Sequence, residues 1–298
     1  MAILNESLFR LSIEDISPIL KSHNLGDLKY IKSISKGIES QTFSLITENS
    51  SYILTLFETD DHNLTQMQNI SHFFTSRGFP VPKIVATCEV SNKKSIISSH
   101  LTGKVKSDWT IDDYEAIGFL LGNIHKSASA IPKMISNTPF IWQLSTSFYQ
   151  IQKQIPKEFQ RLEQEIILLE ESWPLNLPKG FIHGDLWHKN VLFEGANITG
   201  LLDFKPSYEP YILDLANLIK KIPQTNTNFR EALLSGYELS RPLSLEENQS
   251  LDLLVYSKIL ATILYLLNKS LYYPNRKDEF QTYAYLGLLK LDSIASFS

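Results

Sequence analysis

A polar loop that follows an apolar strand carries the residues whose types and spacing could perform chemistry. Asp185 lies in this loop, two residues after His183, and Asn190 follows five residues after Asp185. An apolar run further along the chain ends at Asp203. Phosphoryl transfer from ATP needs a carboxylate that orients the acceptor hydroxyl, and oxygen ligands that hold a divalent metal on the phosphates. Asp185, Asn190 and Asp203 supply this set.

The joint pattern is more informative than any of its members. A lone Asp or Asn beside an apolar strand is typical of a turn or a helix cap. Here His-x-Asp-x-x-x-x-Asn is followed by a hairpin whose second strand ends in Asp203-Phe204, and a strand-rich region precedes it. This combination predicts a phosphotransferase.

The elements that must position this loop fall into a strand-rich part and a helical part. A helix capped by Ser12 comes first, and short strands and one helix follow, at 30–31, 42–47, 52–57, 61–77 (the helix), 83–90 and 95–100. After about residue 105 the apolar spacing is helical, at 111–125, 140–154, 157–172, 211–221, 226–238, 244–270 and 278–295, with strands only around 180–203. We therefore expect an α+β fold with a small antiparallel-sheet lobe, 1–101, and a larger, mostly helical lobe, 102–298.

The composition limits the binding partners and the cellular compartment that we expect for this protein. The 298 residues carry 28 Lys plus Arg and 32 Asp plus Glu, a formal net charge of −4, which argues against binding to nucleic acid or to an anionic membrane. The single cysteine, Cys88, indicates a reducing, cytoplasmic compartment. The most apolar stretch, 259–267, is too short to span a bilayer and predicts a buried core helix. The sequence leaves the oligomeric state open.

Several motifs resemble the aminoglycoside phosphotransferase and choline kinase superfamily, whose members are protein-kinase-like kinases of small molecules. Within it, the sequence resembles the bacterial homoserine kinases most. The resemblance is carried by segments in both lobes: 37–43, 52–58, 77–82, 183–185, 190–193, 203–204 and, more weakly, 236–243. It implies a bilobal, protein-kinase-like fold that uses ATP and Mg²⁺.

The resemblance also implies roles for single residues. Asp185 would be the catalytic base at the acceptor hydroxyl, and Asn190 and Asp203 would be the magnesium ligands. His183 would brace the loop. Asp214 matches the Asp-Leu-Ala segment of the superfamily, and we expect a structural role for it because an acidic residue in the first turn of a helix stabilises exposed amide groups.

The residues expected to bind the nucleotide differ from those of related kinases, which place a lysine on the third strand of the small lobe to hold the phosphates. Here the matching position is Thr55, as in the homoserine kinases, so the cation that clamps the phosphates stays unassigned. Lys36 is a candidate beside Gly37, and the alternative for it is a solvated turn lysine. Adenine is expected near Ser99 and Leu101, between the lobes.

The resemblance implies that the acceptor is a small polar metabolite, with homoserine first among the candidates. The carboxylate of homoserine needs a positively charged partner in the protein. Lys258 could be that partner, although a lysine beside an apolar helical run is more often solvated. Trp187, Tyr208, Glu209 and Tyr211 would suit an amine instead, as in choline-type or aminoglycoside substrates, and the tyrosines could equally pack the helical lobe. A catalytically silent nucleotide-binding protein is the remaining alternative.

Overall fold

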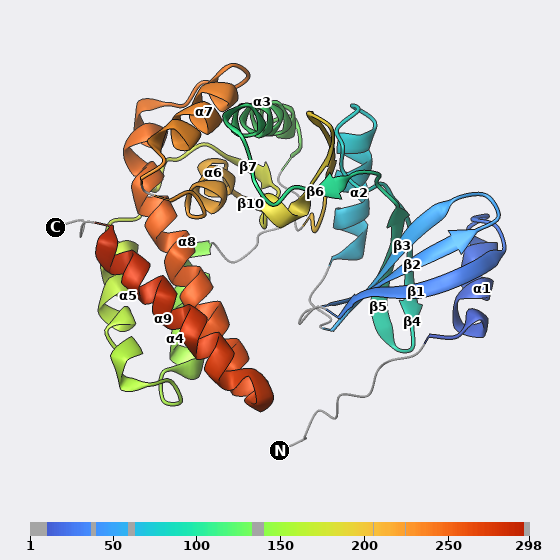
Figure 1. The fold of residues 1–298 in the computed structure, drawn as a ribbon, viewed down its shortest axis with the longest axis horizontal. Helices are drawn as coiled ribbons and strands as arrows, with labels where there is room; N and C mark the ends of the chain where they lie inside the picture. The colour runs from blue at the N-terminus through green and yellow to red at the C-terminus, as the bar shows by residue number, and fades with distance from the viewer. Residues whose placement is uncertain are drawn as a thin grey trace. The chain divides into compact units, whose positions relative to one another are not determined.

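The computed structural model describes residues 11–36, 40–58, 63–132, 140–204, 206–223 and 225–294 (Figure 1). The first part contains α1 (Ile13–Ser22), β1 (Leu28–Lys36), β2 (Ser40–Thr47), β3 (Ser51–Phe57), α2 (Leu64–Thr75), β4 (Ile84–Val90), β5 (Lys93–Ser99) and β6 (Lys104–Val105). The second part contains α3 (Ile111–Ala128), α4 (Phe140–Ile151), η1 (Lys157–Phe159), α5 (Leu162–Glu171), β7 (Lys179–Ile182), η2 (His188–Asn190), β8 (Val191–Glu194), β9 (Asn197–Leu201), β10 (Ser207–Pro210), α6 (Ile212–Ile219), α7 (Thr227–Glu238), α8 (Leu245–Tyr272), η3 (Pro274–Arg276) and α9 (Lys277–Ser293).

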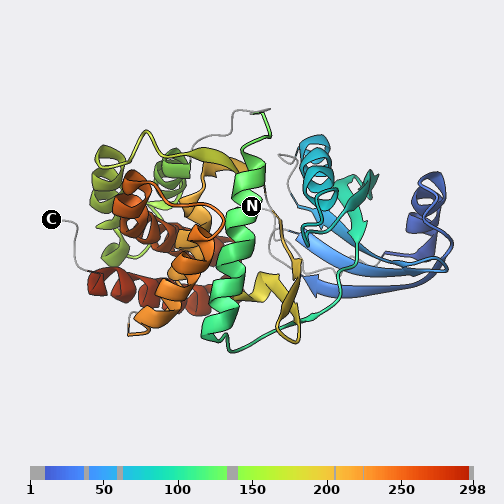
Figure 2. The ribbon, with the colours of Figure 1, turned by 90° about the horizontal axis from the view of Figure 1, so that it is seen from above.

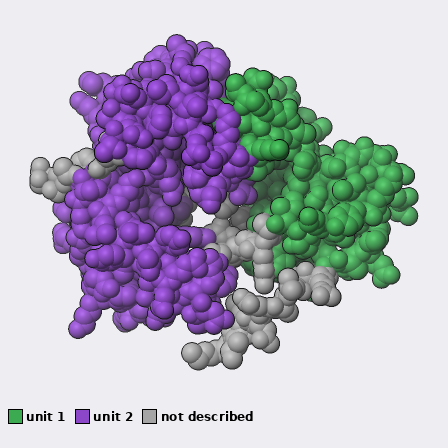
Figure 3. Space-filling view, in the orientation of Figure 1, with its two compact units in different colours: residues 1–104, 192–202 green, residues 105–191, 203–298 purple. Residues whose placement is uncertain are grey.

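The chain folds into two compact units (Figure 3). The first comprises Met1–Lys104 and Leu192–Leu202, and the second comprises Val105–Val191 and Asp203–Ser298. The chain therefore passes between the units three times, and the β8–β9 hairpin groups with the N-terminal strands although the sequence places it far from them. The assignment of nucleotide binding to one lobe and substrate binding to the other stays a prediction.

An antiparallel sheet in the order β1-β2-β3-β5-β4 forms the centre of the first unit. Alternating side chains point to opposite faces of a strand. Leu54 and Ile97 accordingly join Ile16 and Leu20 of α1 in one apolar cluster, whereas Phe57 and Ile96 join a second cluster against α2. Both helices therefore cover the sheet with the apolar faces that their spacing predicts.

Cys88 on β4 packs against the cluster that contains α1. Burial raises the pKa of its thiol to about 11, so this side chain is a protonated, weakly polar part of the packing.

Helix α8 is the centre of the second unit. By length and composition it could cross a membrane, yet 61% of its most apolar window is buried inside the protein, as in a core helix. Helices α4, α6 and α9 pack around it. The stretch 259–267 is thus part of a longer buried helix, in agreement with the sequence prediction.

Helices α3 and α7 lie side by side (Figure 1 and Figure 2) and approach so closely that glycine is required at their contact. A Cβ atom on Gly236 of α7 would overlap the carbonyl oxygen of Glu115, and one on Gly118 of α3 would overlap that of Leu233. The contact matters for the site because α3 carries His125, which lies fully buried near its C-terminal end.

We predict that Gly236→Ala lowers the free energy of unfolding by about 1–3 kcal/mol, because the added methyl group forces the two helix backbones apart. Urea unfolding followed by circular dichroism measures the effect. The control is Ser235→Ala on the exposed face of the same helix, which should change stability by about 0.5 kcal/mol or less. Equal stabilities of the two variants would contradict the close approach.

Candidate active site

The loop after β7 is held in shape by hydrogen bonds among its own residues. The Asn190 side-chain amide donates to the carbonyl oxygen of Asp185 over 2.9 Å, and the Asp185 backbone N–H donates to Nδ1 of His183 over 3.3 Å. Asn190 is buried, whereas Asp185 is only half-buried. These bonds hold together the two ends of the segment from His183 to Asn190, in which the sequence places Asp185 and Asn190 five residues apart.

The buried carboxylate of Asp214, in the first turn of α6, anchors the start of this loop. It accepts hydrogen bonds from the backbone N–H of His183 at 2.6 Å and from that of Gly184 at 3.0 Å. Gly184 adopts φ = +86°, a backbone conformation that residues other than glycine rarely take. The predicted structural role of Asp214 therefore has a definite form here: it bonds two amides of the loop that holds Asp185.

A chain of buried hydrogen bonds continues from Asp214 into α3 and α7. His125 Nε2 lies 3.2 Å from Asp214, and His125 Nδ1 lies 2.9 Å from the Tyr237 hydroxyl. Arg241 donates to that hydroxyl over 3.0 Å and to Glu247 over 2.9 Å. Arg241, which a substrate carboxylate could have used, is thus engaged in this chain.

The charges in this chain set the direction of its hydrogen bonds. Burial opposes ionisation of Asp214, but the hydrogen bonds that it accepts, first from His125 and then from the His183 amide, hold its pKa below the ordinary value. Burial, the largest influence, lowers the pKa of His125, which is therefore neutral. A neutral imidazole that donates from Nε2 to Asp214 must accept at Nδ1. Each donor in the chain thus points toward Asp214, from Arg241 through Tyr237 and His125.

Asp203 lies just after the β8–β9 hairpin and is exposed. Its φ is +52°, which is uncommon outside glycine but tolerated by Asp. The next residue, Phe204, places its ring edge-on against the His183 ring, with 5.4 Å between centroids. This contact brings the chain at Asp203 back to the loop that holds Asp185 and Asn190.

The donor set of Asn190 and Asp203 fits a magnesium ion. Because the Asn190 amide nitrogen is used by Asp185, the carbonyl oxygen of the same side chain is the atom that can serve as a ligand. Within the described ranges, no three His, Cys, Asp or Glu side chains converge on one point. This is compatible with Mg²⁺, which usually takes one or two protein oxygen ligands and completes its shell with water and substrate phosphates.

The residues predicted on the nucleotide side lie in the first unit. Thr55 is on β3, opposite Thr42 and Ile96. Ser99 ends β5, and its hydroxyl accepts from the backbone N–H of Lys83 over 2.9 Å. Their role in nucleotide binding stays a prediction.

Three further residues complete the predicted nucleotide set. Leu101 packs beside Gly200 of β9. Lys36 is the last residue of β1, and Gly37 lies outside the described residues.

The predicted acceptor-side residues have packing partners in the second unit. Tyr211 is buried, with its ring 4.9 Å from that of His125 and 4.6 Å from the guanidinium of Arg241. Tyr208 lies on β10, edge-on to Phe181. The structure therefore gives both tyrosines a packing role, and contact with a substrate stays a prediction for them.

Glu209 and Trp187 differ in exposure. Glu209 is buried and accepts from the backbone N–H of Phe140 over 2.9 Å. Trp187 is half-buried in the Asp185 loop, where the ammonium groups of Lys189 and Lys221 lie 5.3 Å and 5.6 Å from its ring centroid. A ring flanked by two cations is a poor receptor for a third one.

Lys220 and Lys221 are the residues that the sequence analysis did not single out. Lys220 and Lys221 follow the apolar run of α6, a position where a basic residue ordinarily completes a helix end, so nothing in the sequence distinguished them. Lys258 on α8, for which the sequence left a substrate-binding and a solvated role open, is only 9% exposed, which does not fit the solvated role. Its ammonium group lies 4.6 Å from the Phe140 ring centroid.

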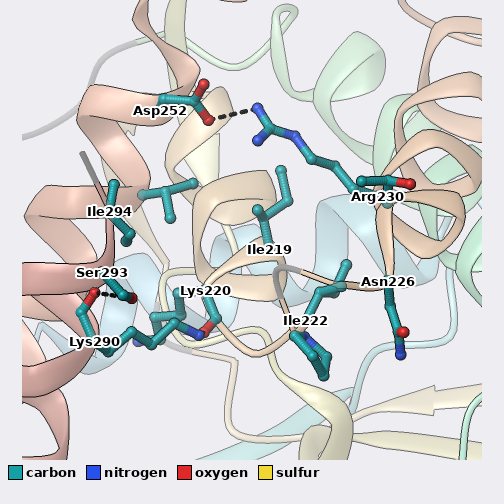
Figure 4. A pocket seen from close by; sticks show the side chains of 12 residues that line it. Ile219, Lys220, Ile222, Asn226, Arg230, Asp252, Lys290, Ser293 and Ile294 are labelled. Atoms are coloured by element: carbon teal, nitrogen blue, oxygen red, sulfur yellow. Dashed lines mark hydrogen bonds and ion pairs between the residues drawn. The ribbon is translucent and has the colours of Figure 1, made fainter.

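Lys220 also lines a pocket of about 350 Å³ bordered by α6, α7, α8 and α9 (Figure 4). The other charged residues of its lining are Lys290 and the ion pair of Arg230 with Asp252, in which nitrogen and oxygen lie 2.5 Å apart. The rest of the wall is largely apolar.

Comparison with known proteins identifies the family. The sequence profile of the Phosphotransferase enzyme family matches residues 31–248. A homoserine kinase of Methylobacterium nodulans is 28% identical over 269 residues, which cover 84% of each chain. One of Bartonella tribocorum is 30% identical over 247 residues, which cover 77% of each chain.

A solved structure is similar in fold. The amicoumacin kinase hAmiN, in complex with AMP-PNP, Ca²⁺ and Ami, has a TM-score of 0.72 at 16% identity, with coverage of 95% of this chain and 96% of that one.

The chain belongs to the phosphotransferase enzyme family. The predicted resemblance and the predicted kinase-like α+β fold are both confirmed. Among its relatives are proteins named homoserine kinase, which cover most of the chain.

We predict that His125 makes the fold sensitive to acid. Burial lowers the pKa of this imidazole in the folded chain, so below the ordinary pKa of 6.5 the unfolded chain binds a proton more readily than the folded chain does. Stability therefore falls as the pH decreases below 6.5. His125→Gln should remove up to about 1.4 kcal/mol per pH unit from the slope of unfolding free energy between pH 5 and 6.5.

Urea unfolding at several pH values measures this slope. The matched control is His72→Gln, the same substitution at an exposed position of α2, and the effect of burial is the difference between the slopes of the two variants. An unchanged slope in His125→Gln would show that His125 titrates alike in the folded and unfolded chains.

Proposed function

We propose that this phosphotransferase moves the γ-phosphoryl group of ATP to the side-chain hydroxyl of homoserine, in the cytoplasm. The observation that supports it most is the joint arrangement of Asp185, Asn190 and Asp203 around one braced loop. The relatives named homoserine kinase support the choice of acceptor.

In the proposed reaction, Asp185 accepts a hydrogen bond from the acceptor hydroxyl and takes its proton as the oxygen bonds to the γ-phosphorus. The bond from that phosphorus to the bridging oxygen breaks, and ADP leaves with the electron pair. Asn190 and Asp203 would hold Mg²⁺, which neutralises charge on the phosphates when bound. Asp214 positions the loop through the His183 and Gly184 amides and touches no substrate.

We predict that Asp185→Asn lowers homoserine-dependent turnover by about 10²- to 10⁴-fold, because the amide cannot accept the hydroxyl proton. A coupled ADP-release assay with Mg²⁺-ATP measures it over homoserine, choline, ethanolamine and an aminoglycoside. Turnover of the unsubstituted protein with homoserine supports the proposal. If the protein turns over choline or an aminoglycoside but not homoserine, the proposed acceptor is wrong and the acceptor is an alcohol that carries only positive charge.

The metal-ligand assignment has a separate test. Asp203→Ala should weaken Mg²⁺-dependent ATP binding more than Asp185→Asn does, because it removes a carboxylate oxygen proposed to be a ligand. Isothermal titration with ATP, with and without Mg²⁺, measures both variants. The reverse order would overturn the assignment, and an unsubstituted protein that binds no ATP would favour a catalytically silent protein.

A further inference from the structure

Three lysines, two just after α6 and one on α8, interact electrostatically with Asp185. Lys220 and Lys221 follow α6, and Lys258 lies in the middle of α8. The charge of each interacts with the Asp185 carboxylate. Asp185 is the residue proposed to orient the acceptor hydroxyl, and Lys221 lies 5.6 Å from the ring centroid of Trp187 in the same loop.

Packing holds these lysines in place. The Lys220 ammonium donates to the Thr262 hydroxyl over 3.1 Å, and that hydroxyl donates to the Lys258 carbonyl oxygen over 2.9 Å. This ties the end of α6 to α8. Lys258 is further fixed by Phe140, and Lys221 by Trp187, the second residue after Asp185.

The cluster is unfavourable for stability. Burial, together with the neighbouring charges of Lys258 and Lys221, lowers the pKa of Lys220 to about 7 despite the attraction of Asp185. Burial also lowers the pKa of Lys258 although Asp214, Asp185 and Glu209 attract it. Replacing such a buried cation with an apolar residue often stabilises a protein.

The nearby acidic groups have other partners. Asp214 bonds the loop amides and His125, and Glu209 bonds the Phe140 amide. An anion placed among the lysines would reduce their mutual repulsion and favour their charged forms.

We propose that Lys220 and Lys258 bind the carboxylate of the acceptor, so that the site selects hydroxy acids and rejects alcohols that carry only a positive charge. The inference rests on the proposed function. A short hydroxy amino acid presents its hydroxyl and its carboxylate a few bonds apart, and the charges of both lysines act on Asp185, which would hold the hydroxyl. Lysine serves here as a point charge, which needs no bidentate geometry.

The test compares two acceptors that differ only in the carboxylate: homoserine and 3-aminopropan-1-ol. The unsubstituted protein should prefer homoserine in kcat/KM. Lys258→Met and Lys220→Met should each raise the KM for homoserine by about 10- to 100-fold, as for a lost hydrogen bond to a charged group, with the KM for ATP nearly unchanged. Both variants should discriminate less between the two acceptors.

Thermal unfolding distinguishes a binding role of these lysines from a structural role, because the loss of a structural residue would lower the melting temperature. Each variant should melt at the same or a higher temperature than the unsubstituted protein while it loses acceptor affinity. Lys269→Met is the matched control, because Lys269 lies on α8 about 16 Å along the axis from Lys258. It should change neither the KM for homoserine nor the preference between acceptors.

The other outcomes separate the failure of this inference from that of the proposed function. Turnover of homoserine with an unchanged KM in both lysine variants would overturn the inference alone. A raised KM for ATP instead would assign the lysines to the phosphates and also overturn it, and so would efficient turnover of 3-aminopropan-1-ol or choline. No ADP release with any acceptor would overturn the proposed function and this inference with it.

Discussion

The carboxylate of Asp214 is the interaction on which the rest of the site depends. It is fully buried, and it bonds the backbone of the two residues that precede Asp185. A buried carboxylate is tolerated only when its oxygens are well bonded. Because the amides of the loop supply these bonds, the loop and α6 stabilise each other.

The same carboxylate connects distant helices. Through His125 it reaches α3, and through Tyr237 and Arg241 it reaches α7 and the start of α8. The backbone contact between α3 and α7, made possible by Gly118 and Gly236, sets the distance across which these side chains meet. The geometry of one loop is thus fixed by packing far from it.

Much of the fold could be predicted because its signals are local. The predicted helix at 111–125 matches α3, which a capping box at Thr110 begins, and the apolar spacing of 244–270 matches α8. Strand β10 was missed because Ser207–Pro210 is four residues long, ends in proline and has no alternating pattern. It forms by pairing with β7, a long-range event.

The residues of the candidate site also differ in whether local sequence signals could identify them. Asp185, Asn190 and Asp203 could be found because their types and spacing are specific. The environment of Lys258 could not, because its burial comes from helices α4 and α6, which lie far from it in the sequence and pack on α8. For the same reason the sequence could not reveal that the Lys220 ammonium donates to Thr262, one helical turn after Lys258 on α8.

The buried chain of hydrogen bonds also bears on how the protein is made. His125 meets Asp214 across 89 residues and Tyr237 across 112 residues of sequence. Contacts so far apart close large loops, which slows folding, and chains emerge from the ribosome N-terminus first. A nascent chain that ends before α7 therefore holds His125 and Asp214 without Tyr237 and Arg241. The chain of hydrogen bonds behind the loop of Asp185 can be completed only after every described strand has been synthesised.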